Sequence, residues 1–186
     1  MEKTESTGHD SSGGLRGYKG HIHEGGHRVP FIARWGDGTS GGSLIEPGSR
    51  SQQTICIQDW VATMYELTGQ PMKKGHALDS VSLLPVFAGK QPANRPLRDV
   101  SVYQQGGSAN QLAIRRRDWK MILDEKERPS ELYNLAEDLK EEDNRINDPD
   151  QQQRIDELKK LYNRIRYQSD RSTPVVDYTN SNIENS

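Results

Sequence analysis

The apolar residues of this chain are few and lie in short segments, and this grouping limits what the chain can fold into. They make up 31% of its 186 residues, below the ~45–50% usual for globular proteins, a figure that also counts glycine. Loops rich in glycine and proline separate the segments, and the polar excess lies at both ends. We expect a modest core built from short elements, because a chain of this length is enough for one domain of ordinary size.

The order of these segments predicts an α/β protein. Val29–Trp35 is interpreted as a buried strand. Two helices follow: one with Asp59 as N-cap and Gly69 as its stop, and one over Ser80–Gly89 with Pro85 in its first turn. Short antiparallel strands and an amphipathic helix come next. Their predicted ranges are Val100–Tyr103, Asn110–Arg116, Trp119–Asp124 and Glu131–Leu135, and the helix runs from Asp148 and Pro149 to about Tyr167.

Charge and hydropathy exclude some classes of protein. The 25 basic and 27 acidic residues give a net charge of −2, which argues against a nucleic-acid binder that relies on bulk charge. No apolar run approaches the ~20 residues that a membrane span needs. The single cysteine, Cys56, permits no internal disulfide and does not specify a compartment. We expect it to act as a small buried hydrophobe.

A glycine-rich loop from Gly14 to Phe31 carries the side chains best suited to chemistry. It contains one lysine, three histidines, two arginines and one glutamate. Lys19 lies between Gly17 and Gly20, and glycine lets the backbone approach a ligand closely. An ammonium beside exposed N–H groups suits a tetrahedral oxyanion such as sulfate or phosphate, although most loop lysines are simply solvated.

The three histidines of this loop leave several interpretations open. Metal ligation is the weakest, because their spacing is not that of the HExxH motif and the intervening glycines would leave a site loose. We expect no metal ligands here. His21 and His23 are candidates for facing a substrate, and a plain loop role is the alternative. Glu24 and Arg28 are expected to support the loop through an ion pair between them.

Two motifs in the loop resemble the late signature of the sulfatase family. Leu15–Gly20 reads LRGYKG and Glu24–Pro30 reads EGGHRVP, and the family commonly shows L-R-G-x-K-G followed by E-G-G-x-R-V-P. Other segments are similar to family patterns, namely Asp59–Gly69, Ser82–Pro85, Asp118–Lys120 and Glu131–Leu135. The resemblance covers roughly Gly14 to Ile165.

The resemblance implies the C-terminal part of an alkaline-phosphatase-like α/β sandwich, with a small antiparallel subdomain and a C-terminal packing helix. On this basis we divide the chain into a polar loop (1–14), the last core elements of the α/β domain (15–97), the sheet with its helix (98–167) and a disordered tail (168–186). It also implies arylsulfatase-like hydrolysis of sulfate esters, with Lys19 contacting the substrate sulfate. We expect Lys19 to be partly buried and to face a cavity.

Parts of the family's catalytic apparatus are not found in the sequence. The C/S-x-P/A-x-R motif that yields the formylglycine nucleophile is absent, as are the paired aspartates and the D-N-G motif that bind a divalent cation, usually Ca²⁺. We therefore expect a C-terminal fragment that is inactive alone. The implied substrate is a sulfated small molecule or carbohydrate, with no nucleic acid and no membrane span involved.

Two alternatives to a sulfatase stay open. One is a non-catalytic remnant or binding module of the same fold, and the other is a phosphodiesterase or phosphonate hydrolase of the same superfold. The family is usually secreted, periplasmic or lysosomal, but this chain does not specify its own compartment.

Overall fold

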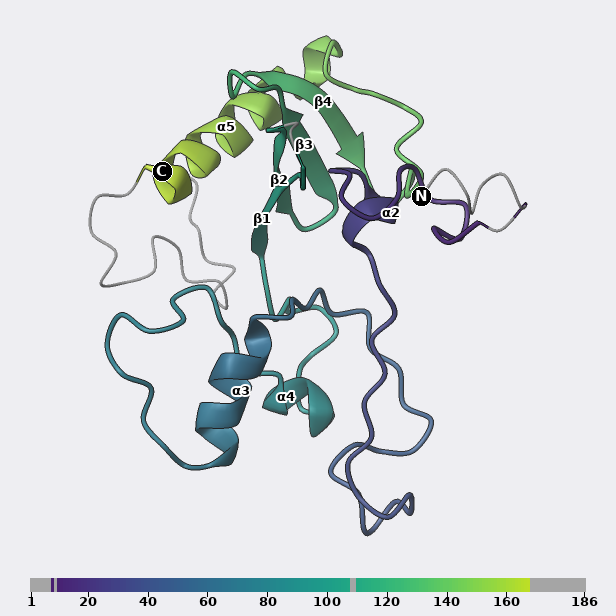
Figure 1. Cartoon of the computed structure of the whole chain (residues 1–186), viewed down its shortest axis with the longest axis vertical. Helices are drawn as coiled ribbons and strands as arrows, with labels where there is room; N and C mark the ends of the chain where they lie inside the picture. The colour runs from purple at the N-terminus through teal and green to yellow at the C-terminus, as the bar shows by residue number, and fades with distance from the viewer. Residues whose placement is uncertain (1–7, 9, 108–109, 168–186) are drawn as a thin grey trace. The chain divides into compact units, whose positions relative to one another are not determined.

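The computed structural model describes residues 8, 10–107 and 110–167, and these form two compact units (Figure 1). The sheet unit combines the described residues of 1–30 with those of 100–163, and the helical unit combines 31–99 with 164–167. The contacts thus group residues 15–30 with the sheet, whereas the sequence-based division grouped them with 31–97. The tail expected over 168–186 lies outside the described residues. Among the helices described, none has the length and apolarity to cross a membrane.

The sheet unit is built on four antiparallel strands that follow one another in chain order. They are β1 (Val100–Gln104), β2 (Leu112–Arg116), β3 (Trp119–Leu123) and β4 (Pro129–Asn134). The predicted meander is confirmed, with ends shifted by one or two residues. Arg117 and Asp118 connect β2 to β3, and Arg117 has a φ of 54°. Positive φ is typical of the two-residue turns that join twisted strands.

Both faces of this sheet are buried. Side chains alternate along a strand, so Met121 and Leu123 lie on one face of β3 and Lys120 and Ile122 on the other. All four side chains are fully buried. Because both faces of the sheet are covered, a loop that packs on one face can be held firmly in place.

The predicted final helix is confirmed as α5 (Gln152–Arg166), which follows a 3-10 turn, η1 (Pro149–Gln151). The guanidinium carbon of Arg154 lies 4.1 Å from the ring centroid of Trp119, on the Met121 face. Asp148 precedes the turn as expected, but its carboxylate accepts from Arg145 and makes no capping bond. The buried residues of the helix recur at helical spacing and are Ile155, Leu158, Leu161 and Tyr162.

The loop before and within α2 (Glu24–His27) covers the opposite face. Figure 1 shows α2 and α5 on opposite sides of the sheet. Ile22 is 1% exposed and is the apolar centre of this loop. It belongs to one buried cluster with Ala113, Ile122, Tyr133 and Leu135. The loop that carries Lys19 is therefore part of the core of the sheet unit.

The helical unit contains α3 (Asp59–Leu67) and the short α4 (Leu84–Phe87). Both end in the same way, at Gly69 and at Gly89, each with a φ of 65°. In α3 the N–H of Gly69 bonds to Glu66 and that of Gln70 to Tyr65, which is a Schellman motif. The predicted stops at both glycines are confirmed, although α4 is shorter than the predicted helix over Ser80–Gly89.

Two details at the start of α3 differ from expectation. Asp59 is the first helical residue rather than the N-cap, and it is fully buried in an ion pair with Arg98. Its carboxylate accepts hydrogen bonds from the backbone N–H groups of Cys56 and Val81. Cys56 is partly exposed rather than buried. Asp59 thus ties the turn before the helix to a distant segment.

The strand predicted over Val29–Trp35 is wrong. These residues adopt no strand conformation, and Val29 and Ile32 are 76% and 93% exposed. A strand needs a neighbouring strand for its backbone hydrogen bonds, and none within the described residues is paired with this segment. Phe31 instead stacks on Phe87 with ring centroids 6.4 Å apart.

Candidate functional site

Lys19 lies in a turn whose backbone only glycine can adopt without strain. Gly17 and Gly20 have φ values of 80° and 100°, which place both in the region disfavoured for other residues. The carbonyl of Gly20 accepts a hydrogen bond of 2.9 Å from the N–H of Gly106. The turn is therefore fixed to the segment that follows β1.

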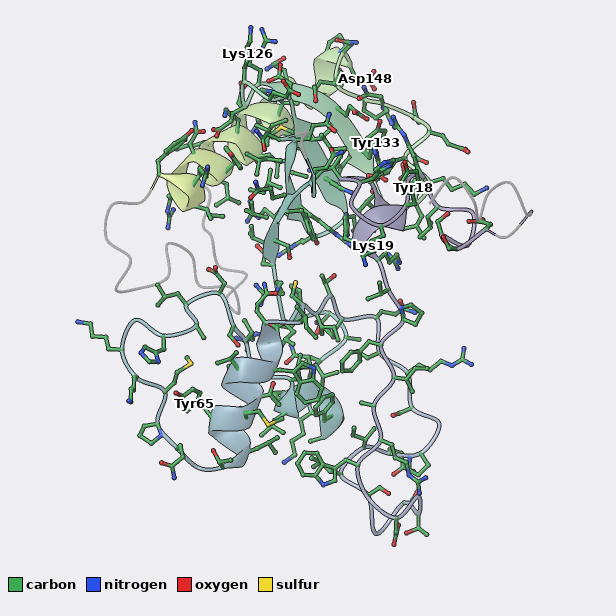
Figure 2. All side chains as sticks on the ribbon, viewed as in Figure 1. Tyr18, Lys19, Tyr65, Lys126, Tyr133 and Asp148 are labelled. Atoms are coloured by element: carbon green, nitrogen blue, oxygen red, sulfur yellow. The ribbon has the colours of Figure 1, made fainter. Side chains whose placement is uncertain are left out.

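The side chain of Lys19 is exposed, so the expectation that it is partly buried is wrong. Within the part of the chain that the structure describes, its ammonium has no hydrogen-bond or ion-pair partner. Figure 2 shows Lys19 beside α2 and far from Lys126, which lies at the other end of the same unit. A lysine without an internal carboxylate partner keeps its full charge available for an external anion.

The Lys19 turn packs directly against α2 because that helix contains two glycines. A Cβ added to Gly25 would lie 2.3 Å from the carbonyl oxygen of Gly17, and one added to Gly26 would lie 2.1 Å from that of His21. The N–H of Gly25 also donates to the carbonyl of Arg16 at 2.9 Å. The position of α2 therefore determines the position of the turn.

The segment before α2 is held at Glu131 of β4. One oxygen of this carboxylate, Oε2, accepts from the Tyr133 hydroxyl, from Arg16 Nη1 at 3.1 Å and from His23 Nε2 at 3.2 Å. The hydrogen bond from His23 is the largest influence, and together with the hydrogen bond from Tyr133 and the charge of Arg16 it lowers the pKa of Glu131 to about 2, against the effect of burial. Burial and the bond to Glu131 raise the pKa of Tyr133.

The two histidine candidates therefore differ in their surroundings. His23 is turned toward Glu131, whereas the ring of His21 lies 3.8 Å from that of Tyr18, centroid to centroid. The sequence grouped both as candidates for facing a substrate, and that role stays a prediction for each.

Glu24 is almost completely buried, and its carboxylate meets several cations. Oε1 lies 3.1 Å from Lys120 Nζ, and Oε2 lies 3.3 Å from Arg28 Nη1 and 4.0 Å from Arg115 Nη1. The ion pair between Glu24 and Arg28 that the sequence predicted is present. Burial raises the pKa of Glu24, but Lys120, His27 and Arg115 together hold that pKa below its ordinary value.

Lys120 and Glu141 complete this arrangement. Glu141 Oε2 accepts from the backbone N–H of Glu24 at 2.6 Å, and Oε1 lies 2.8 Å from Lys120 Nζ as an ion pair without hydrogen-bond geometry. Glu24, Lys120 and Glu141 thus form a closed ring of contacts, called the charge ring below. Each of the three is no more than 1% exposed.

His27 closes one side of the charge ring. Its Nε2 lies 3.1 Å from Lys120 Nζ and 3.1 Å from the carbonyl oxygen of Ile22, and its ring stacks on Tyr103 at 4.4 Å. Burial, followed by the charge of Lys120, lowers the pKa of His27 to about 4. The imidazole is therefore neutral at neutral pH.

Sequence reasoning missed Lys120 and Glu141. A signal for Lys120 is present, since it is the one charged residue in the strand sequence WKMIL, and a buried lysine requires carboxylate partners. No comparable signal marks Glu141, which reaches Glu24 across 117 positions of the chain. Only the fold brings these residues together.

No metal centre is formed by the residues that sequence analysis considered. Within residues 10–107 and 110–167, no group of three or more His, Cys, Asp or Glu is arranged to hold a metal ion. His21, His23 and His27 have separate partners: Tyr18, Glu131 and Lys120.

The sequence is similar to that of a characterised enzyme. No family model matches the chain. An N-acetylgalactosamine-6-O-sulfatase of Bacteroides thetaiotaomicron is 30% identical to it, over 74% of this chain and 27% of the enzyme.

The fold is similar to those of solved structures. One, from work on the metabolism of multiple glycosaminoglycans by Bacteroides thetaiotaomicron, matches with a TM-score of 0.65 at 25% identity, over 86% of this chain and 33% of that one. Another, solved in complex with its substrate D-glucosamine-2-N,6-O-disulfate, matches with a TM-score of 0.53 at 22% identity, over 63% and 25%. The chain thus spans about a quarter to a third of the length of these proteins.

Proposed function

The chain is homologous to sulfatases, and from this premise we propose that it forms one part of a sulfatase active site in which Lys19 contacts the sulfate of the substrate. The chain matches only 27% of its curated relative, so the complete reaction is proposed for this chain together with the rest of a sulfatase domain. The observation that carries the proposal is an exposed ammonium that has no partner among the described residues and lies on a turn bonded to the segment after β1.

The chemistry of sulfate ester hydrolysis explains the use of such a lysine. Negative charge shifts among the sulfuryl and leaving-group oxygens as the S–O bond breaks, and a preorganised cation stabilises that charge more strongly than water does. Lys19 also lies beside Gly20, where an added Cβ would meet no described atom within 4 Å, and this leaves room for the bulk of a sulfate group. Its role is to bind and orient this group rather than to attack it.

We assign the nucleophile and the metal ligands of the active site to parts of a sulfatase domain outside this chain. The sulfatase relationship implies a divalent cation, but the described residues offer no group of three or more ligands for one. The substrate class we propose is a sulfated carbohydrate, because the curated relative is named for a 6-O-sulfated amino sugar.

The test is hydrolysis of 4-nitrophenyl sulfate and of N-acetylgalactosamine 6-sulfate by the full-length gene product. Lys19→Met is expected to lower kcat/KM by about 10²-fold, the size of effect found when one donor to a developing oxyanion is removed. Lys126→Met is the matched control, since Lys126 is exposed and remote in the same unit, and it should leave kcat/KM unchanged. Equal rates for wild type and Lys19→Met would contradict the role of Lys19.

Two further measurements separate the alternatives. The 186-residue chain alone is expected to show no turnover of 4-nitrophenyl sulfate, with or without Ca²⁺, and turnover above background would contradict the proposal that the site needs other parts. Faster hydrolysis of a phosphate diester or phosphonate than of a sulfate ester by the full-length product would favour the phosphoryl-transfer alternative.

A further inference from the structure

The charge ring buries three charged side chains in a core that is otherwise largely apolar. Lys120 lies on the same face as Ile122, inside a core of apolar residues. Replacement of a buried ion pair by well-packed apolar residues is often neutral or stabilising. Stability alone therefore does not account for a lysine and two glutamates that are each no more than 1% exposed.

The charge ring joins three segments that are distant in sequence. Glu24 is the first residue of α2, Lys120 is in β3, and Glu141 follows β4. Glu141 binds both the backbone N–H of Glu24, at 2.6 Å, and the ammonium of Lys120, at 2.8 Å, while the ammonium lies 3.1 Å from the Glu24 carboxylate. The hydrogen bonds from the Glu24 N–H to Glu141 and from Lys120 to the Glu24 carboxylate are directional, so they specify one position for the start of α2, which apolar contacts do not.

The position of α2 is transmitted to Lys19 through backbone contact. Gly25 and Gly26 allow α2 to approach the carbonyls of Gly17 and His21 so closely that no other side chain fits between them. Gly17 adjoins the Tyr18–Lys19 pair. A shift of α2 would thus move the turn that carries the ammonium.

We propose that Lys120 and Glu141 are positioning residues, which fix α2 through the charge ring and thereby hold Lys19 at the position where it meets a sulfate group. This inference rests on the function proposed above for Lys19. Neither side chain contacts the substrate, because both are fully buried. Their effect on the reaction passes through α2 and the Lys19 turn.

The first test measures backbone opening in the 186-residue chain, without reference to activity. Amide hydrogen exchange reports local opening, and the N–H groups of Glu24, Gly25, Gly26 and Arg28 all have internal acceptors. In Lys120→Met these amides should exchange at least about 10-fold faster, while the amides of β2 and β3 keep their protection. Unchanged exchange at all four amides would overturn the proposal.

Matched variants control this test. Lys126→Met and Glu125→Gln change exposed residues of the same types in the β3–β4 turn and should leave the exchange of α2 unchanged. If Lys120→Met loses the sheet, the isosteric Glu24→Gln takes its place, with the same expectation for Gly25, Gly26 and Arg28. Equal exchange in Glu24→Gln and wild type would then be the contrary result.

The second test separates positioning from a general structural role by a double-mutant cycle in the full-length gene product. Lys120→Met should lower kcat/KM by about 10-fold when Lys19 is present and by less than about 2-fold in the Lys19→Met background. Equal losses in both backgrounds would overturn positioning. If Lys19→Met alone leaves kcat/KM unchanged, the proposed function fails, and the positioning role fails with it. The exchange data still decide whether the charge ring fixes α2.

Discussion

His27 shows how one buried residue makes the stability of the sheet unit depend on pH. Its imidazole is stacked on Tyr103 and lies 3.1 Å from the ammonium of Lys120. Burial and this charge lower its pKa from 6.5 to about 4. Between these two values the unfolded chain binds a proton that the folded chain does not, so the free energy of unfolding falls as the pH falls.

We predict that the free energy of unfolding of the sheet unit decreases by on the order of 1–2 kcal/mol from pH 7 to pH 5 through His27 alone. His27→Gln should remove this part of the pH dependence, because an amide does not titrate in the range. Urea unfolding at each pH, followed through NMR signals of β2 and β3, measures the free energy of unfolding of the sheet unit. His76→Gln is the control, since His76 is exposed. The same slope for His27→Gln and wild type would show that His27 does not titrate this way.

Glu131 makes the stability of the sheet unit depend on pH in a separate and lower pH range. Its pKa of about 2 lies below the ordinary 4.5, so the stabilisation it provides is present above pH 4.5 and is lost as the pH falls toward 2. Glu131→Gln should therefore flatten the acid limb of the unfolding curve below pH 4.5 and leave the change between pH 7 and pH 5 intact. If Glu131→Gln changed the pH dependence only between pH 7 and pH 5, Glu131 would not be the group that titrates below pH 4.5.

The C-terminal ends of α3 and α4 depend on single glycine residues, so they can be predicted from the local sequence. Gly69 takes a φ of 65° and a Cβ there would meet no atom within 4 Å, so the cost of a side chain is conformational. We predict that Gly69→Ala lowers the free energy of unfolding by about 1–2 kcal/mol. Gly41→Ala is the control, because Gly41 has no positive φ and equal open space. Equal urea midpoints for the two variants would contradict this explanation.

Elements with a local signal were predicted well, and elements that need a distant neighbour were not. The strands around Trp119, the helix stop at Gly69 and the amphipathic α5 follow from alternation, glycine chemistry and periodicity. The segment Val29–Trp35 has the composition of a strand, but composition does not supply the adjacent strand that completes it. It is therefore exposed within the described residues.

In the candidate site, too, contacts between residues close in sequence were predicted and contacts between distant residues were not. Glu24 and Arg28 are four residues apart, so their spacing was enough to predict the ion pair between them. The partners of Glu24 in the core, Lys120 and Glu141, come from β3 and from the segment after β4. Pairing across about a hundred residues depends on strand register, which the sequence does not state.

At the scale of the whole molecule, both units use buried ion pairs where a chain richer in apolar residues would use hydrophobic contacts. The sheet unit has the charge ring, and the helical unit has the pair of Asp59 and Arg98, at 0% and 2% side-chain exposure. Asp59 also accepts from the N–H groups of Cys56 and Val81, at 2.7 and 3.0 Å. One carboxylate thus accepts from a guanidinium and from two backbone donors.

This arrangement predicts a specific pattern of instability in the helical unit. Asp59→Ala should lower the free energy of unfolding by about 3–5 kcal/mol, because it leaves the buried charge of Arg98 without its carboxylate. Asp59→Ala combined with Arg98→Met removes both charges and should cost less than Asp59→Ala alone, even though two residues are changed. Asp59→Asn keeps an acceptor for one of the two backbone donors and should lie between wild type and Asp59→Ala. Urea unfolding of wild type, Asp59→Ala, Arg98→Met and the double variant gives the coupling energy. A double variant less stable than Asp59→Ala would mean that the uncompensated charge of Arg98 is not the source of the loss.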